Sequence, residues 1–277
     1  MVNITVESLK NKWPKRNEDS HKGNFGHVLI IAGNKKFGGA GILSSSAAVY
    51  AGAGLVTLAT DPINFTAVHS RCPEIMLINF NDFQSLEEQL ATTTGVVIGP
   101  GLGDSEESLK ILEFTLKNIK NSIPLVIDGS AISLIVKNNI TVKHQNLIFT
   151  PHQKEWERLS GIKIENQDQQ LNQNKTNILN AYVILKKHHT EIYSPNLTMR
   201  KILAGNPGMA TGGSGDTLTG ILIALISQTK SLDDGVILGT FLHSYVADQI
   251  YKNNAVVIPH ILIQKIPIIL KQLQKKF

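Results

Sequence analysis

Cysteine is almost absent from this chain, since Cys72 is the only one among its 277 residues. A single cysteine cannot form an internal disulfide, which excludes a disulfide-stapled scaffold and fits a reducing compartment. Aromatic residues are also scarce, at 6% of the sequence, and no pattern of basic and aromatic residues typical of RNA binding is present. With 42% hydrophobic and 18% charged residues, the composition is that of an ordinary folded protein.

A long hydrophobic run is missing as well. Residues 1–12 are largely polar, include Glu7 and lack the apolar core of a secretory signal. The longest uncharged stretch, residues 37–60, is full of Gly, Ser, Ala and Thr, which is more typical of a packed helix, a turn and a strand than of a membrane span. We therefore expect a soluble, cytoplasmic protein without a membrane partner.

The excess of positive charge is small, because 27 basic and 22 acidic residues give a formal net charge of +5. The basic residues are mostly scattered, with small clusters only at 10–16 and 271–276. A nucleic-acid binder usually concentrates such charge in one arm or stripe. We expect no nucleic-acid partner, whereas small anions such as nucleotides suit the charge better.

Short apolar runs alternate with helix-like segments along the chain. Six runs rich in Val, Ile or Leu are predicted to be buried strands: 27–32, 55–59, 96–98, 125–127, 147–149 and 182–185. The predicted helices include 105–118, 166–180, 216–227, 232–251 and 259–274. This alternation predicts an α/β fold in which helices cover both faces of a mostly parallel central sheet. Because no linker or repeat interrupts the pattern, we expect a single domain over residues 1–277.

The strongest signal for chemistry is the segment Asn206–Asp216, which ends in Gly-Gly-Ser-Gly-Asp. Its glycines allow a backbone that turns N–H groups inward, and the uncharged helix that follows adds its N-terminal dipole, so the segment predicts an anion site. Asp216 would then lie beside a bound phosphate and act as a base. A plain glycine-rich turn with Asp216 as a helix cap is the alternative. A Walker A loop and a G-x-G-x-x-G fingerprint after the first strand are both absent.

The segment Thr150–Glu155 follows another predicted strand. Thr150 is predicted to be the N-cap of a helix and Pro151 its first residue. His152 can hydrogen-bond a polar ligand from this place, and Glu155 can orient a metal-bound water. Either residue taken alone is equally compatible with a structural or solvated role.

Other polar residues at strand ends and on helices stay ambiguous at this point. The Gly99–Asp104 loop suits either a close ligand or a tight strand-to-helix turn, and Asp128 directly follows a predicted strand. His243 and Asp248 lie on a predicted helix and are interpreted as structural. Cys72 has no partner that would make it a nucleophile, and no Cys/His cluster has zinc spacing.

Glycine-rich and polar motifs also follow one another in a specific order. They are Ser20–Gly26, Ala32–Gly33, Gly38–Gly41, Ala51–Val56, Pro73–Glu74, Gly99–Gly103, Asp128, Thr150–His152, Glu155 and Asn206–Asp216. In this order they closely resemble the motifs of the ADP/ATP-dependent NAD(P)H-hydrate dehydratases, over about residues 15–270. The resemblance implies a ribokinase-like three-layer α/β/α fold. It also implies a hydro-lyase without the fused epimerase domain that some larger relatives carry.

The reaction that this resemblance implies repairs nicotinamide cofactors whose ring has taken up water at C6. The terminal phosphate of ADP or ATP moves onto the C6 hydroxyl of the S form of NADHX or NADPHX, and elimination of phosphate then restores NAD(P)H. AMP is formed from ADP, or ADP from ATP. Epimerisation of the R form is expected from a separate protein. The resemblance further implies a cytoplasmic homotetramer.

The resemblance also implies roles for individual residues. Asp216 is the base, and the amides of Gly213, Ser214 and Gly215 stabilise the transferring phosphoryl group. Residues expected to contact the hydrated cofactor are Ala40, Gly103, His152 and Asp216. Residues expected near the adenine nucleotide are Lys186, Lys187, His188, His189, Thr190 and Gly215. Mg²⁺ is expected to bridge phosphates with few direct protein ligands, Glu155 acting through water.

Two departures from the family pattern bear on these roles. The family reads Pro-His-Pro-Gly-Glu where this chain has Gln153 and Lys154 in the middle, and Lys-Gly-x-Gly-Thr where it has Lys187, His188 and His189. The lost glycines put the shape of the nucleotide loop in doubt, and the new side chains can contact phosphate. A ribokinase-like kinase for a vitamin precursor and a nucleotide-sensing protein without turnover are the alternatives. The sequence does not distinguish ADP from ATP, or NADHX from NADPHX.

Overall fold

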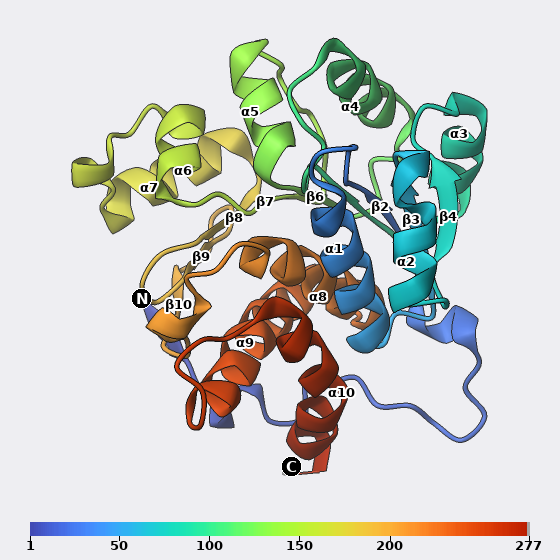
Figure 1. Cartoon of the computed structure of the whole chain (residues 1–277). Coiled ribbons are helices and arrows are strands. Elements are labelled where there is room, and N and C mark those ends of the chain that lie inside the picture. Colours follow the sequence, from blue (N-terminus) through green and yellow to red (C-terminus); the bar gives the residue numbers. More distant parts are fainter. Residues whose placement is uncertain (276–277) are drawn as a thin grey trace.

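The computed structural model describes residues 1–275 and contains one ten-stranded sheet (Figure 1). The strand order is β1-β10-β9-β8-β7-β6-β5-β2-β3-β4. The strands are β1 (Val2–Ile4), β2 (His27–Ile31), β3 (Leu55–Thr60), β4 (Met76–Asn79), β5 (Gly95–Ile98), β6 (Leu125–Ile127), β7 (Leu147–Phe149), β8 (Tyr182–Leu185), β9 (Glu191–Tyr193) and β10 (Arg200–Ile202). The six strands predicted from the sequence are all present, with ends that agree to within one residue.

The sheet is mostly parallel, as predicted. In the sheet order, the seven strands β8, β7, β6, β5, β2, β3 and β4 all run parallel to their neighbours. Strand β9 is antiparallel to both β8 and β10. The β8–β9 turn is short enough for a hairpin, while the parallel strands need helical crossovers. The carboxyl ends of β2, β5, β6, β7 and β8 therefore lie side by side at one edge of the sheet.

Alternate side chains of each central strand enter different cores, which makes the molecule three-layered. In β2, Val28 and Ile30 belong to one core, and Leu29 and Ile31 belong to the other. The first core is covered by α1 (Gly38–Tyr50), α2 (Phe65–Arg71), α8 (Ser214–Gln228), α9 (Leu232–Tyr251) and α10 (Pro259–Lys275). The second is covered by α3 (Phe83–Thr92), α4 (Glu106–Asn118) and α5 (Gly129–Lys137). A third, smaller core lies under α6 (Gln153–Ser160) and α7 (Gln169–Leu179).

The start of α6 differs from the prediction. His152, not Thr150, is the N-cap, because its Nδ1 accepts the amides of Lys154 and Glu155 and the Glu155 carboxylate accepts the His152 amide. The hydroxyl of Thr150 is committed elsewhere, as a donor to Asp128 at 2.7 Å. The first helical residue is accordingly Gln153, and the prediction that Thr150 caps this helix is wrong.

Other helix ends follow from capping side chains. Ser105 caps α4 and Asp168 caps α7, which shortens the predicted 166–180 helix at its start. Asn180, in the left-handed conformation, ends α7. Among residues 1–275, no helix combines the length and the apolar character needed to cross a membrane.

Helix α8 lies between α1 and α9, and glycines allow this close approach. A Cβ on Gly220 would collide with the carbonyl oxygen of Ser44 on α1, and a Cβ on Gly239 of α9 would lie 2.8 Å from the Cα of Leu222. Both glycines have helical backbones, so their role is space and not conformational freedom. The position of α8 is therefore fixed by its neighbours on two sides.

We predict that Gly220→Ala lowers the free energy of unfolding by about 2–3 kcal/mol, because the new methyl group must displace α1. Gly39→Ala is the matched control, since a Cβ there would meet nothing within 4 Å. That change is expected to be neutral or to stabilise by about 0.5 kcal/mol through helix propensity. Urea unfolding measures both, and equal effects of the two substitutions would contradict this account.

Candidate active site

The loops after β2 and β5 meet and bring two predicted substrate residues to one corner. The amide of Gly33 donates to the carbonyl of Pro100, and the amide of Asn34 donates to the carbonyl of Gly101. A Cβ on Gly101 would lie 2.7 Å from the Cβ of Ala40, and a Cβ on Gly103 would collide with the side-chain amide of Asn34. Ala40 and Gly103 thus lie at the same corner, and both are partly exposed.

Asn34 was not predicted to belong to this corner. Its Nδ2 donates to the carbonyl of Leu102 at 3.3 Å, and its Oδ1 accepts the amides of Lys36 and Phe37. The signal in the sequence is only that Asn34 follows Gly33 directly after a strand. Asn34 holds the β2–α1 and β5–α4 loops together and so positions both.

The start of α8 has the backbone features on which the predicted anion site depends. Gly213 is its N-cap in the left-handed conformation, with φ of 93°, which a residue with a side chain rarely adopts. Leu43 of α1 packs directly against Gly213. Among the described residues, the amides of Gly215 and Asp216 have no hydrogen-bond acceptor. Two free N–H groups and the helix dipole point toward the carboxyl edge of the sheet.

Asp216 occupies the first turn of α8, where the helix dipole favours a negative charge. Burial and the nearby charge of Asp128 nevertheless raise the pKa of Asp216 to about 6, while Lys186 partly opposes the increase. A carboxylate with such a pKa is ionised at neutral pH and is a stronger base than an ordinary aspartate. Proton abstraction from a hydroxyl is the chemistry that this environment supports.

A partly buried ion pair lies beside the first turn of α8. Lys186, directly after β8, donates to Asp128 Oδ1 at 2.7 Å, and its Nζ is 4.0 Å from Glu155 Oε2. Burial lowers the pKa of Lys186, but the charges of Asp128, Glu155 and Asp216 outweigh burial and raise it. A Cβ on Gly215 would lie 3.3 Å from Lys186 Nζ. The predicted nucleotide residues Lys186 and Gly215 are therefore adjacent.

His152 presents one nitrogen of its ring to solvent. Because Nδ1 accepts the amides of Lys154 and Glu155, the proton of the neutral ring is on Nε2. The side chain is 53% exposed, and Nε2 lies 3.6 Å from Glu155 Oε1. A β-bridge joins His152 to Lys186 across β7 and β8. His152 is thus an N–H donor next to the lysine.

The β8–β9 turn carries the departure from the family pattern. Lys187 pairs with Glu191 at 3.0 Å, so its charge is partly neutralised. The rings of His188 and His189 lie with centroids 4.0 Å apart, and His189 adopts a left-handed φ of 57°, where the family has glycine. The buried Nδ1 of His189 has no partner among the described residues. Thr190 completes the turn.

A buried chain of hydrogen bonds supports this turn from the third core. Trp156 Nε1 donates to Asn172, Asn172 donates to Tyr193, and the Tyr193 hydroxyl donates to Glu191 at 2.8 Å. Glu191 in turn accepts from Lys187. The turn is therefore fixed to α6 and α7 through polar groups that are buried and paired.

Residues of helix α9 contact the backbone of the glycine-rich segment 205–216. Asp248 accepts the amide of Gly205 and the side-chain amide of Asn206. His243 is buried against the Ser214 backbone, and burial lowers its pKa to about 4 although the bond to Ser214 opposes this. Both residues act on the backbone of the segment, in agreement with their structural interpretation.

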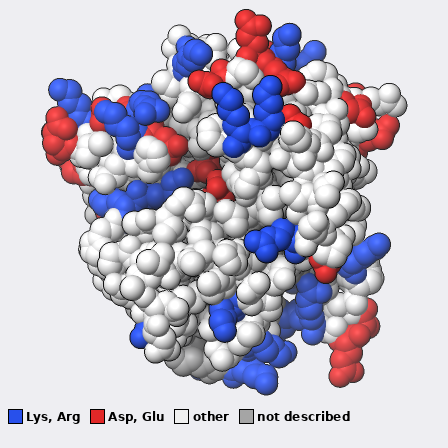
Figure 2. Space-filling model, in the orientation of Figure 1, with Lys and Arg blue, Asp and Glu red and all other residues white. Residues whose placement is uncertain are grey.

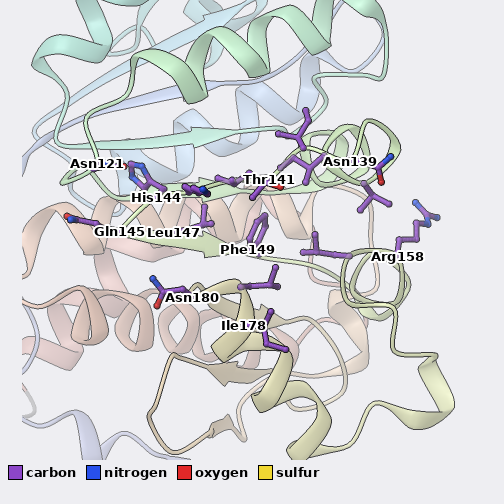
Figure 3. Close-up of a pocket in the computed structure, with 17 residues that line it drawn as sticks. Asn121, Asn139, Thr141, His144, Gln145, Leu147, Phe149, Arg158, Ile178 and Asn180 are labelled. Atoms are coloured by element: carbon purple, nitrogen blue, oxygen red, sulfur yellow. The ribbon is translucent and has the colours of Figure 1, made fainter.

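A cavity of about 770 Å³ lies elsewhere, between α5, α6 and α7 (Figure 3). Figure 3 shows Phe149 in the middle of this trough and Arg158 at one end. None of the candidate catalytic, substrate or nucleotide residues lines it. Cys72 is also outside the site, and burial, with Glu74 nearby, raises its pKa to about 12, so it stays a thiol.

Surface charge is distributed unevenly over the face that Figure 2 shows. Basic side chains are scattered over it without forming one continuous stripe, and a small acidic spot lies where the surface is hollowed near its centre. Among residues 1–275, no group of three or more His, Cys, Asp or Glu side chains is arranged to hold a metal ion.

We predict that Asp216→Asn raises the melting temperature at pH 8 by about 2–4 °C. The pKa of Asp216 in the folded protein, about 6, lies above its ordinary value of 3.8. The ionised carboxylate therefore lowers the free energy of unfolding by its full amount above pH 6. This destabilisation becomes smaller as the pH is lowered from 6 to 3.8. The increase in melting temperature caused by Asp216→Asn should therefore be about half as large at pH 5 as at pH 8. Thermal unfolding at the two pH values measures it, and a gain that does not change with pH would contradict the raised pKa.

Comparisons with known proteins identify the family. The model of the NAD(P)H-hydrate dehydratase family matches residues 28–268. The chain is 43% identical over 272 residues to an ADP-dependent (S)-NAD(P)H-hydrate dehydratase of Staphylococcus aureus, with 98% of each chain covered. It is 37% identical over 239 residues to a bifunctional NAD(P)H-hydrate repair enzyme of Coxiella burnetii, covering 85% of this chain and 48% of that enzyme.

A solved structure supports the fold in the same way. A ribokinase-like superfamily protein from Enterococcus faecalis has a TM-score of 0.96 at 37% identity, covering 99% of this chain and 96% of that one. The ribokinase-like α/β/α fold predicted from the sequence is confirmed. The resemblance drawn from the motifs is confirmed as well, and the chain belongs to the NAD(P)H-hydrate dehydratase family.

Proposed function

We propose that this enzyme restores NAD(P)H from the S form of its hydrate, using the terminal phosphate of an adenine nucleotide. The observation that carries the proposal is the start of α8, where Asp216, with a pKa raised to about 6, adjoins two free backbone N–H groups. A base and an anion site in one helical turn are what transfer of a phosphoryl group to a hydroxyl requires. The name of the Staphylococcus aureus relative supports the substrate and ADP as donor.

The first step is phosphorylation of the C6 hydroxyl. Asp216 takes the hydroxyl proton, the oxygen forms a bond to the terminal phosphorus, and the bond between that phosphorus and the nucleotide breaks. The glycine-rich turn of Gly213, Ser214 and Gly215 carries the negative charge of the transferring group on its N–H groups, of which the Gly215 amide is free in the structure. In the second step phosphate leaves C6 and the neighbouring carbon loses a proton, which restores the ring.

The hydrated nicotinamide would bind at the corner formed by the β2 and β5 loops. Ala40 and Gly103 leave the backbone accessible there, and a larger side chain at Gly103 would collide with Asn34. His152 adds an N–H donor from the end of β7, since its Nε2 carries the proton. These groups would hold the C6 hydroxyl toward Asp216 and exclude part of the solvent.

The adenine nucleotide would bind between Gly215 and the β8–β9 turn, Lys186–Thr190. Lys186 lies against Gly215 and can meet a phosphate, and the unpaired Nδ1 of His189 offers a hydrogen bond at the turn. Lys187 is partly occupied by Glu191, so its contribution to phosphate binding is expected to be smaller.

Mg²⁺ would be held mainly by the nucleotide phosphates. Because the described side chains do not form a metal site of their own, Glu155 would contribute through a bound water and not as a direct ligand. When bound, the ion would neutralise phosphate charge.

The setting of the reaction is part of the same proposal. Residues 1–277 would act as one dehydratase domain in the cytoplasm, as a homotetramer, and a separate epimerase would supply the S form. The bifunctional relative, of which this chain matches about half, supports a second activity that is carried on other residues.

The alternative is a ribokinase-like kinase for a small alcohol, which would use the same base and anion site. Its product would be a stable phosphoester, whereas the dehydratase releases inorganic phosphate. The 43% identity to a dehydratase over nearly the whole chain favours dehydration.

We expect the absorbance at 340 nm to rise when the protein is mixed with hydrated NADH, Mg²⁺ and ADP or ATP, with one phosphate released for each NADH formed. Comparing the two donors ranks them. A stable phosphoester without a rise in absorbance would replace the dehydratase by the kinase.

Asp216→Asn should lower kcat by at least about 10³-fold, because the amide cannot accept the hydroxyl proton. Glu113→Gln is the control, since it makes the same carboxylate-to-amide change on the exposed side of α4. Activity of Asp216→Asn close to that of the control would show that another residue is the base.

A further inference from the structure

Asp128 occupies a helix N-cap position but does not cap its helix. It precedes α5, where an aspartate ordinarily accepts an amide of the first turn, yet its side chain makes no such bond. Instead Oδ1 accepts from Lys186 Nζ and from the Thr150 hydroxyl, each at 2.7 Å. The side chain is 5% exposed. Its orientation is therefore explained by the site and not by α5.

The carboxylate of Asp128 faces the turn that carries the base. A Cβ on Gly215 would lie 4.0 Å from Asp128 Oδ2, and Oδ2 has no hydrogen-bond partner among residues 1–275. The backbone of Gly99 packs against the Asp128 carbonyl and leaves no space for a side chain, which fixes this strand end. The Asp128 carboxylate thus faces Gly215, the residue directly before Asp216 at the start of α8.

Lys186 is a cation that influences three carboxylates here, those of Asp128, Glu155 and Asp216. Lys186 is 2.7 Å from Asp128 and 4.0 Å from Glu155, and no ion pair joins it to Asp216 in the described structure. The other titratable groups around the base are His152, at the end of β7, and the buried, neutral His243 on α9. Lys186 is consequently the cation that can neutralise Asp216. Its ion pair with Asp128 holds the Lys186 ammonium away from Asp216.

We propose that Asp128 is a positioning residue for the base: by binding Lys186 it keeps the lysine from pairing with Asp216, and its own charge keeps Asp216 ready to accept a proton. This rests on the proposed role of Asp216. Without Asp128, Lys186 would turn toward Asp216, and an aspartate paired with a lysine is a weaker base. The direction agrees with the raised pKa of Asp216, to which burial contributes most and Asp128 next.

The test compares the pH dependence of kcat/KM for the wild type, Asp128→Asn and Thr150→Val. The acid limb of the wild type is expected near pH 6, where Asp216 loses its proton. In Asp128→Asn the limb should move to lower pH by about one unit, and kcat at pH 8 should fall about three- to tenfold because the base is weaker. Thr150→Val removes a hydrogen bond to the same oxygen but keeps the charge, so its limb should stay in place.

A limb of Asp128→Asn that coincides with that of the wild type would overturn the proposal, and so would an equal shift in Thr150→Val. The second measurement does not need turnover: ¹³C-carboxyl NMR follows the titration of Asp216 in the ligand-free protein, its signal being identified by its loss in Asp216→Asn. Titration of Asp216 at lower pH in Asp128→Asn is expected. A wild type that is inactive on hydrated NADH would instead contradict the proposed function, and the NMR result would still decide the role of Asp128.

Discussion

The placement of α8 is the constraint on which the rest of the structure depends. This helix is almost uncharged and is buried between α1 and α9, so it cannot rotate or slide without collisions at Gly220 and Gly239. Its first turn nevertheless has to emerge at the carboxyl edge of the sheet with free N–H groups. The left-handed Gly213 makes this transition, and Leu43 packs against it. The packing of α8 therefore also determines where its free N–H groups lie.

At the carboxyl edge of the sheet, the carboxylates outnumber the cations that can pair with them. The first-turn N–H groups of α8 would attract a phosphate, and Lys186 would add a full charge next to them. That lysine is shared by Asp128 and Glu155, which leaves Asp216 without an ion pair. A buried carboxylate without a partner destabilises the folded protein, and the same property makes it reactive. The stability of the fold and the basicity of the site are thus opposed at one residue.

The sequence predicts the central strands well because each is a continuous apolar run buried on both faces. The strands β1, β4, β9 and β10 were not predicted. They are segments of three or four residues without a clear hydrophobic pattern, and Glu191, Arg200 and Lys201 interrupt β9 and β10. The loops singled out from the sequence do lie at the carboxyl edge, because parallel strands bring them together whatever their separation in the chain. The pairing of Asp128 with Lys186 was not predicted, as 58 residues separate them and only the sheet order makes them neighbours. The roles of the individual site residues stay predictions.

The imidazole ring of His152 caps α6 through one nitrogen and would donate to the ligand through the other. Nδ1 caps the N-terminus of α6, and in doing so it fixes the proton of the neutral ring on Nε2, the proposed donor to the ligand. Loss of the His152 ring would leave the amides of Lys154 and Glu155 without this acceptor and so would fray the first turn of α6. Since Glu155 belongs to that turn and lies near Lys186, loss of the cap would spread to the carboxylate cluster. A change at His152 would therefore disturb the order of this turn and remove the proposed ligand donor together.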